Sequence, residues 1–357
     1  MMHLPTLAER PDLFDIIGLA DIDRSTLDAV GVRYHVERRT TDFRELLGDP
    51  AVAAVLVLAS GSHRDFALAA LEAGKHLFVE KPLGFSLSET EAIARAARGS
   101  GIVVMVGYHK RFDPAYQRTR EEVRRLRNLR FVDVTVLHPD EEAFRRHHAL
   151  LPRRSAEEMS EQQMDRLAVR QASTPEIRPL LDATVGPDAP MAVRMALFVL
   201  LTSVIHDLNA LRGILGEPAE VLAAHTWRDG MAQTSLTRFA GDVRVVINWI
   251  SVPDVAHYQE QLRFISPERR VTLAFPSPYL RHAPTPLTVE RMDDGALVVE
   301  QHTVSYEEAF REELHHFRES VLAGRPPAIG VDDALGDARW IEAIARVLLD
   351  SHRRVTA

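Results

Sequence analysis

Residues 73–83 have the sequence Ala73-Gly-Lys-His-Leu-Phe-Val-Glu-Lys-Pro-Leu83. The run His76–Glu80 predicts a short strand, and Pro82 ends it because proline cannot donate a hydrogen bond to a neighbouring strand. Lys81 then lies at the carboxyl edge of a parallel sheet, where ligands bind in open α/β folds. A lysine near an apolar ring can have its pKa lowered and exchange a proton with a substrate hydroxyl. Taken alone, Glu-Lys-Pro is also common in surface turns, so both interpretations are open at this point.

The sequence on either side of this stretch alternates between strand-like and helix-like patterns. Strands are expected over Phe14–Asp21, Val52–Ala59, His76–Glu80 and Ile102–Gly107. Helices are expected over Asp65–Ala73, which ends at Gly74, and over Ser88–Arg98. In the second helix we expect Ser88 as N-cap, with Glu91 completing a capping box. Alternation of this kind predicts a doubly wound parallel sheet, that is, a Rossmann-like α/β domain.

The second part of the chain has a different pattern. Apolar and polar residues alternate in several runs, which predicts a large, open, mostly antiparallel sheet in an α+β domain. These runs are Leu129–His138, Glu220–Trp227, Gln233–Phe239, Val243–Ile250, Gln261–Ile265, Arg270–Phe275 and Leu297–Gln301. Helices are expected over Ala196–Leu215, Tyr306–Ala323 and Asp332–Ser351. We therefore predict a dinucleotide-binding domain over 1–116 and a substrate-binding and oligomerisation domain over 117–357, with an insertion at about 140–193.

Composition excludes several classes of protein. The 357 residues include no cysteine, so disulfides, thiol nucleophiles and cysteine-ligated zinc are excluded, and a reducing cytoplasm is the expected compartment. The net charge of -8 and the lack of a long basic run argue against nucleic-acid binding. The longest apolar stretch, Met195–Ile205, is shorter than the roughly 20 residues of a membrane helix, so no membrane partner is expected.

A second motif, Gly107-Tyr-His-Lys-Arg-Phe-Asp-Pro-Ala-Tyr116, begins 26 residues after Lys81. Together the two motifs resemble the glucose–fructose oxidoreductase, inositol dehydrogenase and rhizopine-catabolism (Gfo/Idh/MocA) family. The resemblance implies a nicotinamide-dependent oxidoreductase. It also implies that, besides Asp21, a further set of residues borders the cofactor. These are Ser60, Gly61, His63, Glu80, Lys81, Pro82 and Arg111.

Asp21 ends the first expected strand. In a Rossmann unit, an acid at this place hydrogen-bonds the adenosine ribose hydroxyls and repels a 2′-phosphate, so it favours NAD over NADP. Ile22 and Asp23 follow, and neither is an arginine that could bind a 2′-phosphate. A loop acid that caps the next helix is the other interpretation of Asp21.

The third motif is Thr202-Ser-Val-Ile-His-Asp-Leu-Asn-Ala-Leu-Arg212. The family pattern here is Asp-x-Gly-x-His-x-x-Asp, with the first acid and the histidine four apart on one helical face. His206 matches the histidine, whereas Thr202 replaces the first aspartate and Asn209 the last. The resemblance implies that Lys81, His206 and Thr202 are the catalytic residues. Thr202 can hydrogen-bond a hydroxyl, but it cannot place a negative charge near His206.

No Gly-x-Gly-x-x-Gly fingerprint precedes the first expected strand. The segment from His3 to Phe14 is similar to the helix that follows those glycines in a Rossmann unit. A sheet without the first strand is expected to have a gap between the strands at Phe14–Asp21 and Val52–Ala59. A start assigned too late, a true truncation that binds NAD poorly, and another segment that fills the slot are all open explanations. We expect the chain as given to bind NAD more weakly than one extended by that strand and loop.

These observations predict an NAD(P)-dependent oxidoreductase that transfers a hydride between nicotinamide and a sugar, cyclitol or related polyol, with NAD as the expected cofactor. The alternative is a non-catalytic sugar-binding or regulatory protein on a decayed dehydrogenase scaffold. We expect a homo-oligomer formed through the C-terminal sheet. No metal site is expected, because the adjacent histidines at 147–148 and 315–316 point apart on a helix.

Overall fold

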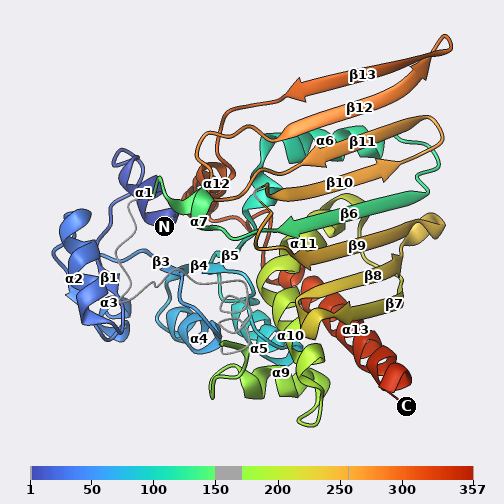
Figure 1. Ribbon diagram of the computed structural model, residues 1–357. Helices are drawn as coiled ribbons and strands as arrows, with labels where there is room; N and C mark the ends of the chain where they lie inside the picture. The colour runs from blue at the N-terminus through green and yellow to red at the C-terminus, as the bar shows by residue number, and fades with distance from the viewer. Residues whose placement is uncertain (1, 149–170, 256, 357) are drawn as a thin grey trace.

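The computed structural model describes residues 2–148, 171–255 and 257–356 (Figure 1). Two small parallel sheets form the N-terminal part, and one eight-stranded sheet forms the C-terminal part. Part of the insertion expected at about 140–193 lies outside the described residues. The two fold classes predicted from the sequence, a Rossmann-like unit followed by a large open sheet, are confirmed.

The strand that ends at Lys81 lies in the middle of a three-stranded parallel sheet. Its order is β3 (Ala54–Val57), β4 (His76–Glu80) and β5 (Val104–Gly107). Helices α4 (Arg64–Glu72) and α5 (Leu87–Ala97) connect these strands. The side chains of Leu77, Phe78 and Val79 are fully buried, as expected for a central strand that is covered on both faces.

The first strand of the chain belongs to a different sheet. Strand β1 (Leu19–Ala20) pairs in parallel with β2 (Arg39–Thr40), and α2 (Arg24–Arg33) connects the two. The strand expected over Phe14–Asp21 was thus too long, because only two of its residues pair with a neighbour. None of the described strands lies between β1 and β3. The N-terminal strands therefore form two separate sheets, and the division falls where the sequence predicts a gap.

The expected cap of helix α5 was wrong by two residues. Ser86, not Ser88, is the N-cap, and its hydroxyl accepts a hydrogen bond from the backbone N–H of Glu89 at 3.2 Å. The Glu89 carboxylate in turn accepts from the backbone N–H of Phe85 at 2.9 Å. Two serines with an acid three residues after each fit the same pattern, and the backbone geometry selects the earlier one.

A short helical segment joins the two parts of the molecule. After β5 the chain forms the 3-10 turn η1 (His109–Phe112) and then α6 (Pro114–Arg124). Asp113 caps α6 by accepting from the backbone N–H groups of Ala115 and Tyr116. Residue 116, where the sequence places the domain boundary, lies inside α6. The boundary stays a prediction.

The C-terminal sheet has the order β13-β12-β11-β10-β6-β9-β8-β7. Only β6 and β9 are parallel among these neighbours, so the prediction of a mostly antiparallel sheet is confirmed. The strands are β6 (Phe131–His138), β7 (Glu220–Trp227), β8 (Ala232–Arg238), β9 (Arg244–Ser251), β10 (Gln259–Ile265), β11 (Arg269–Ala274), β12 (Pro286–Asp293) and β13 (Ala296–Thr303). Strand β12 was not predicted from the sequence. This strand begins at a proline, and only two of its side chains, Leu287 and Val289, are buried.

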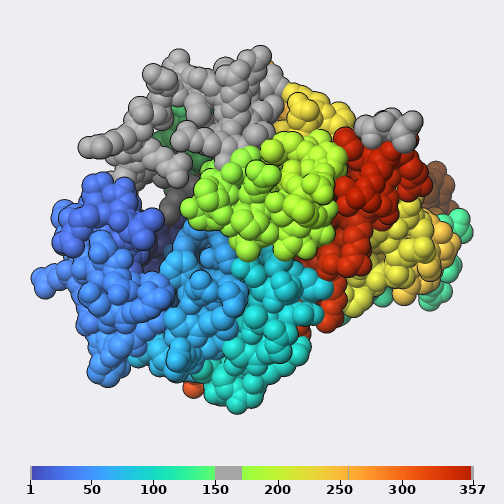
Figure 2. Space-filling view, turned by 90° about the horizontal axis from the view of Figure 1, so that it is seen from below, coloured from blue at the N-terminus to red at the C-terminus, as the bar shows by residue number. Residues whose placement is uncertain are grey.

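Helices fill the space between this sheet and the Rossmann-like part. They are α7 (Glu142–Arg145), α9 (Arg178–Val185), α10 (Met191–Val199), α11 (Ile205–Leu215), α12 (Ala309–Ala323) and α13 (Val331–Thr356). Helix α13 packs against both α5 and β7 and thereby ties the two parts together. Figure 2 shows α13, in red, along the surface between the yellow-green helices and the yellow strands.

The apolar helix of the third motif is longer than the sequence indicated. Met191–Leu215 is one continuous helical segment of 25 residues, and the mean hydropathy of its most apolar 18-residue stretch is 1.7, which is long and apolar enough to span a membrane by those criteria alone. About 72% of its most apolar stretch is buried inside the protein, as in the core helix of a folded domain. The helix exceeds the apolar stretch Met195–Ile205 because it also includes charged residues such as Arg194 and Asp207, and the expectation of no membrane partner stays a prediction.

A buried ion pair fastens this helix to α13. Arg212 Nη1 donates to Asp337 Oδ1 at 2.7 Å, and both side chains are nearly inaccessible to solvent. Asn209 donates to the other oxygen of the same carboxylate, also at 2.7 Å. Gly336 leaves room for the guanidinium, since a Cβ at that position would overlap it.

Candidate active site

Lys81 is held at the junction between the two parts of the molecule. It directly follows the last residue of β4, and its ammonium donates a hydrogen bond to the carbonyl oxygen of Thr202 at 2.5 Å. Residues 121 positions apart in the chain are thus brought together as the resemblance implied. The place of Lys81 at the carboxyl edge of the parallel sheet is confirmed.

The helix that carries Thr202 and His206 contains a π-helical turn, η2 (Leu200–Val204), between α10 and α11. Turns of this kind are rare and occur often at functional sites. The Thr202 hydroxyl donates back to the carbonyl of Phe198 at 2.7 Å, so its main chain, not its side chain, meets Lys81. His206 follows four residues later, and its Nδ1 is buried with no hydrogen-bond partner.

A second lysine enters the same region from η1. The Lys110 ammonium forms an ion pair with Glu260 of β10 and lies 3.9 Å from Asp207 Oδ1. All three side chains are buried, and the Tyr258 hydroxyl donates to the other oxygen of Glu260 at 2.5 Å. The ring of His109, next to Lys110, lies 5.0 Å from the ring of His206.

This environment lowers the pKa of the basic groups around Lys81. Loss of solvent lowers the pKa of Lys81, and the charge of Lys110 adds to that effect against the opposing charge of Glu80. Burial also lowers the pKa of His206 well below its usual value, helped by Lys81. Burial lowers the pKa of His109 to about 3. Both histidines are therefore neutral at neutral pH, and Lys81 gives up its proton more easily than an ordinary lysine.

The buried acids of the site behave differently from one another. Burial raises the pKa of Asp207 well above its usual value, and the neighbouring Glu260 raises it further. Burial would raise the pKa of Glu260 too, but the charge of Lys110 and the hydrogen bonds of Asp207, Lys110 and Tyr258 together outweigh burial and lower that pKa. The two buried acids are therefore shifted in opposite directions, with the pKa of Asp207 raised and that of Glu260 lowered.

The loops expected to border the nicotinamide meet at the carboxyl edge of β3 and β4. His63 is buried between two carbonyl groups, with its ring nitrogens 2.7 Å from the Pro82 oxygen and 2.8 Å from the Ala59 oxygen. Ser60 is exposed next to Gly61, whose positive φ of 90° suits glycine. His63 therefore has a structural contact that links the two loops.

Glu80 contacts the N-terminal helix. Its carboxylate lies 2.7 Å from Nε2 of His3 in α1 (His3–Ala8) and accepts from the backbone N–H of Lys81. Burial would raise the pKa of Glu80, but the hydrogen bond from His3 and the neighbouring basic groups, Lys81 among them, together outweigh burial and lower that pKa. Glu80 thus remains ionised beside Lys81.

Two of the residues expected to bind the cofactor lie apart from this group. Asp21 follows β1 in the separate two-stranded sheet, where it is exposed and accepts from the backbone N–H of Asp23 at 2.8 Å. Asp23, not Asp21, caps the next helix. Arg111 donates to Asn209 at 3.3 Å and lies 3.6 Å from Asp333, so it contacts the helices of the second part.

Reasoning from the sequence missed the cluster of Lys110, Asp207 and Glu260. Lys110 and Asp207 lie inside quoted motifs, but no pattern indicated that they meet. Glu260 carried a usable signal, because it occupies the buried face of a strand whose next inward residues are Leu262 and Phe264. A charged residue on an apolar face indicates a buried partner.

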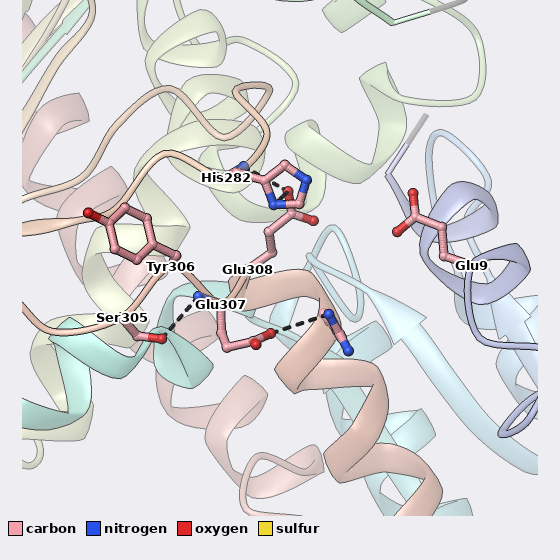
Figure 3. Close-up of a pocket in the computed structure, with 7 residues that line it drawn as sticks. Glu9, His282, Ser305, Tyr306, Glu307 and Glu308 are labelled. Carbon is pink, nitrogen blue, oxygen red and sulfur yellow. Dashed lines mark hydrogen bonds and ion pairs between the residues drawn. The ribbon is translucent and has the colours of Figure 1, made fainter.

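A pocket described by the structure lies elsewhere on the surface. It is lined by residues of the loop before α12 and by residues facing that loop, and none is a predicted site residue (Figure 3). These residues are Glu9, His282, Ser305, Tyr306, Glu307, Glu308 and Arg311. Figure 3 shows Glu9 on the far side of the pocket from Glu307. The pocket is therefore separate from the candidate site around Lys81.

The structure thus joins a Rossmann-like unit to a large, mostly antiparallel sheet, with Lys81 and His206 near the junction. Residues 1–108 match the oxidoreductase family with an NAD-binding Rossmann fold that is named for Gfo, Idh and MocA. The N-terminal part of the chain, residues 1–108, is thus similar to the Gfo/Idh/MocA family, and most of the curated relatives it matches are covered over only about a third of their length.

Relatives and solved structures extend the match along the chain. It is 32% identical to the uncharacterized oxidoreductase YrbE of Bacillus subtilis (strain 168) over 120 residues, which are 33% of this chain and 35% of that protein. It is 24% identical to the myo-inositol 2-dehydrogenase of Thermotoga maritima over 330 residues, or 89% of this chain and 84% of that enzyme. KijD10, a 3-ketoreductase from Actinomadura kijaniata solved with NADP and TDP-benzene, has a similar fold, with a TM-score of 0.71, 18% identity, and coverage of 97% of this chain and 93% of that one.

Proposed function

We propose that this protein is an NAD-dependent oxidoreductase that transfers a hydride between nicotinamide and a carbinol carbon of a sugar, cyclitol or related polyol. The observation that carries the proposal is the hydrogen bond from Lys81 to Thr202, which puts a lysine with a lowered pKa one helical turn from His206. The name of one relative, a myo-inositol 2-dehydrogenase, supports the substrate class.

The residues present fit the two ends of a dinucleotide. Asp21 is exposed after β1, where it can hydrogen-bond ribose hydroxyls, and the loops at Ser60 and Pro82 border the region near Lys81. NAD, when bound, supplies the hydride chemistry. The chain supplies orientation and proton exchange: Lys81 polarises the substrate oxygen, and the unpartnered Nδ1 of neutral His206 is free to accept its proton.

A spectrophotometric assay tests the proposed function. NADH formation is followed with myo-inositol, scyllo-inositol and a panel of aldoses, and the reverse reaction with the matching ketones. We expect turnover with at least one neutral polyol. Binding of a polyol without any turnover in either direction would instead favour the non-catalytic alternative. That alternative is less favoured, because the chain keeps both Lys81 and His206 and brings them together.

We expect NAD to bind more tightly than NADP. The Asp21 carboxylate repels a 2′-phosphate, and Asp23 adds a second negative charge two residues later. Calorimetric titration with both cofactors measures the ratio of their affinities. Asp21→Asn should reduce the preference for NAD, because it removes the charge that repels the 2′-phosphate. Tighter binding of NADP by the unchanged protein would contradict the assignment of Asp21.

The same proposal includes a homo-oligomer formed through the C-terminal sheet. Large apolar side chains are exposed on its two outermost strands at one end, with Met292 65%, Leu297 63% and Val299 49% accessible. Side chains of this kind are favourable to bury between subunits.

A further inference from the structure

The side chain of His63 joins the two loops that follow strands β3 and β4. His63 occupies the N-cap position of α4, and it is only 2% accessible to solvent. Its Nδ1 lies 2.7 Å from the carbonyl oxygen of Pro82, and its Nε2 lies 2.8 Å from the carbonyl oxygen of Ala59. Each ring nitrogen thus faces an oxygen that can only accept a hydrogen bond.

Two contacts of this kind require two ring protons. A neutral imidazole has one N–H and one lone pair, so one of its nitrogens would face a carbonyl oxygen with no proton between them. Turning the ring over does not help, because ring carbons would then lie at hydrogen-bond distance from the same oxygens. A buried carbonyl that loses its partner costs free energy, so both contacts are worth keeping. The imidazolium, with an N–H on each nitrogen, fits both carbonyls.

We propose that His63 is a positioning residue held in its doubly protonated, positively charged form, and that losing one proton releases one of the two loops. The inference rests on the proposed function, in which the loops at Ser60 and Pro82 border the cofactor. While the ring is charged, it ties the start of the first loop, at Ala59, to Pro82 in the second. Because Pro82 directly follows Lys81, the same contact fixes the main chain beside that lysine.

The segments that contact the His63 loop carry charged groups of both signs. They are Arg64 and Asp65 on α4, Glu80 and Lys81 before Pro82, Glu89 on α5, and Glu176 and Arg178 beside Ile177, which packs near Gly61. Arg64 and Asp65 lie 3.5 Å apart and are exposed, and Glu89 accepts from the Ser62 hydroxyl at 2.9 Å. Within the described part of the chain, the hydrogen-bond partners of the His63 ring are the two carbonyl oxygens and no carboxylate.

The ring nitrogens themselves report the number of protons, in the full-length protein without cofactor or substrate. In histidine labelled with ¹⁵N in the ring, the chemical shift separates a nitrogen that carries a proton from one that keeps its lone pair. At about pH 7.5, roughly one unit above the usual titration of histidine, an unrestrained ring is mostly neutral. We expect His63 to show two N–H nitrogens at this pH. A lone-pair nitrogen in His63 overturns the proposal, whether or not the protein turns over a polyol.

His76 is the matched control within the same molecule. It begins β4, and its Nδ1 accepts a hydrogen bond from the backbone N–H of Val103 at 3.0 Å, so this nitrogen must keep its lone pair. We expect one lone-pair nitrogen in His76 at the same pH. Both rings are assigned by through-bond correlation to the backbone, so no variant has to fold for this comparison. Equal protonation of the two rings would contradict the argument from geometry.

The effect on the loops is measured through the pH dependence of stability and of NAD affinity. The folded protein binds the second His63 proton more tightly than the unfolded chain does. The resulting stability is complete below about pH 6.5 and is lost as the pH rises above it. Relative to His63→Phe, which keeps a ring but donates no hydrogen bond, the unchanged protein should therefore lose unfolding free energy as the pH is raised.

NAD affinity, measured by calorimetry, should weaken over the same pH range in the unchanged protein and change less in His63→Phe. Equal pH dependence of both quantities in the two folded proteins overturns the positioning role. If His63→Phe does not fold, the ring measurement decides alone. Two N–H nitrogens in a protein that binds no NAD would support the charged form of His63 and count against the proposed function.

Discussion

Replacing Lys81 by methionine should lower turnover about 100-fold or more while the protein stays folded, because a positioned acid/base group contributes on that scale. His206→Ala should cause a loss of similar size. If the two residues act on the same substrate proton, the double variant should be little slower than either single one, since residues that act as a unit are not additive. Steady-state rates with the best polyol from the panel measure all three.

Lys75→Met is the matched control for this prediction. Lys75 precedes the same strand, β4, and its ammonium donates to the Asp49 carbonyl at 2.7 Å, away from the carboxyl edge. We expect this variant to keep nearly full turnover. Circular dichroism and melting curves show whether each variant is folded. Full activity of folded Lys81→Met and His206→Ala would mean that both residues are misassigned.

The sequence predicted those parts of the fold that depend on local patterns. Strand β4 was found residue for residue, because an apolar run before Glu-Lys-Pro has one plausible end. The strand at Phe14–Asp21 was drawn too long, since strand length depends on a neighbour that hydrogen-bonds it and not on apolar character alone. Which strands pair with each other depends on the whole fold. The pairing could therefore be predicted only where a motif already implied it.

The candidate site divides in the same way. Lys81, Thr202 and His206 were grouped through a resemblance, and the structure places the Lys81 ammonium on the Thr202 carbonyl, four residues before His206. The role of Thr202 could not be predicted, because its residue type suggests a hydroxyl contact, whereas the structure uses its carbonyl. The π-turn and the Lys110–Glu260 ion pair join segments whose spacing along the chain has no regular pattern, so only the folded chain shows them.

The Asp337→Ala variant should lose about 3–5 kcal/mol of unfolding free energy, the usual cost of removing one member of a buried ion pair. The Asp337 carboxylate is fully buried and accepts from both Arg212 and Asn209. Without it, the partners left to the buried Arg212 guanidinium among the described residues are the exposed Glu217 carboxylate and the Asp333 carbonyl. Urea denaturation of both proteins measures the difference.

An exposed ion pair on the same part of the molecule is the matched control. Arg238 and Glu220 lie 2.8 Å apart on neighbouring strands, and both side chains are well exposed to solvent. Glu220→Ala should cost less than about 1 kcal/mol, because water screens such pairs. A loss of that small size in Asp337→Ala as well would show that Arg212 finds other partners. In that case packing contacts hold α13 in place, and the next contact to test is that of Trp340 with Phe239, which follows β8, at a ring distance of 5.3 Å.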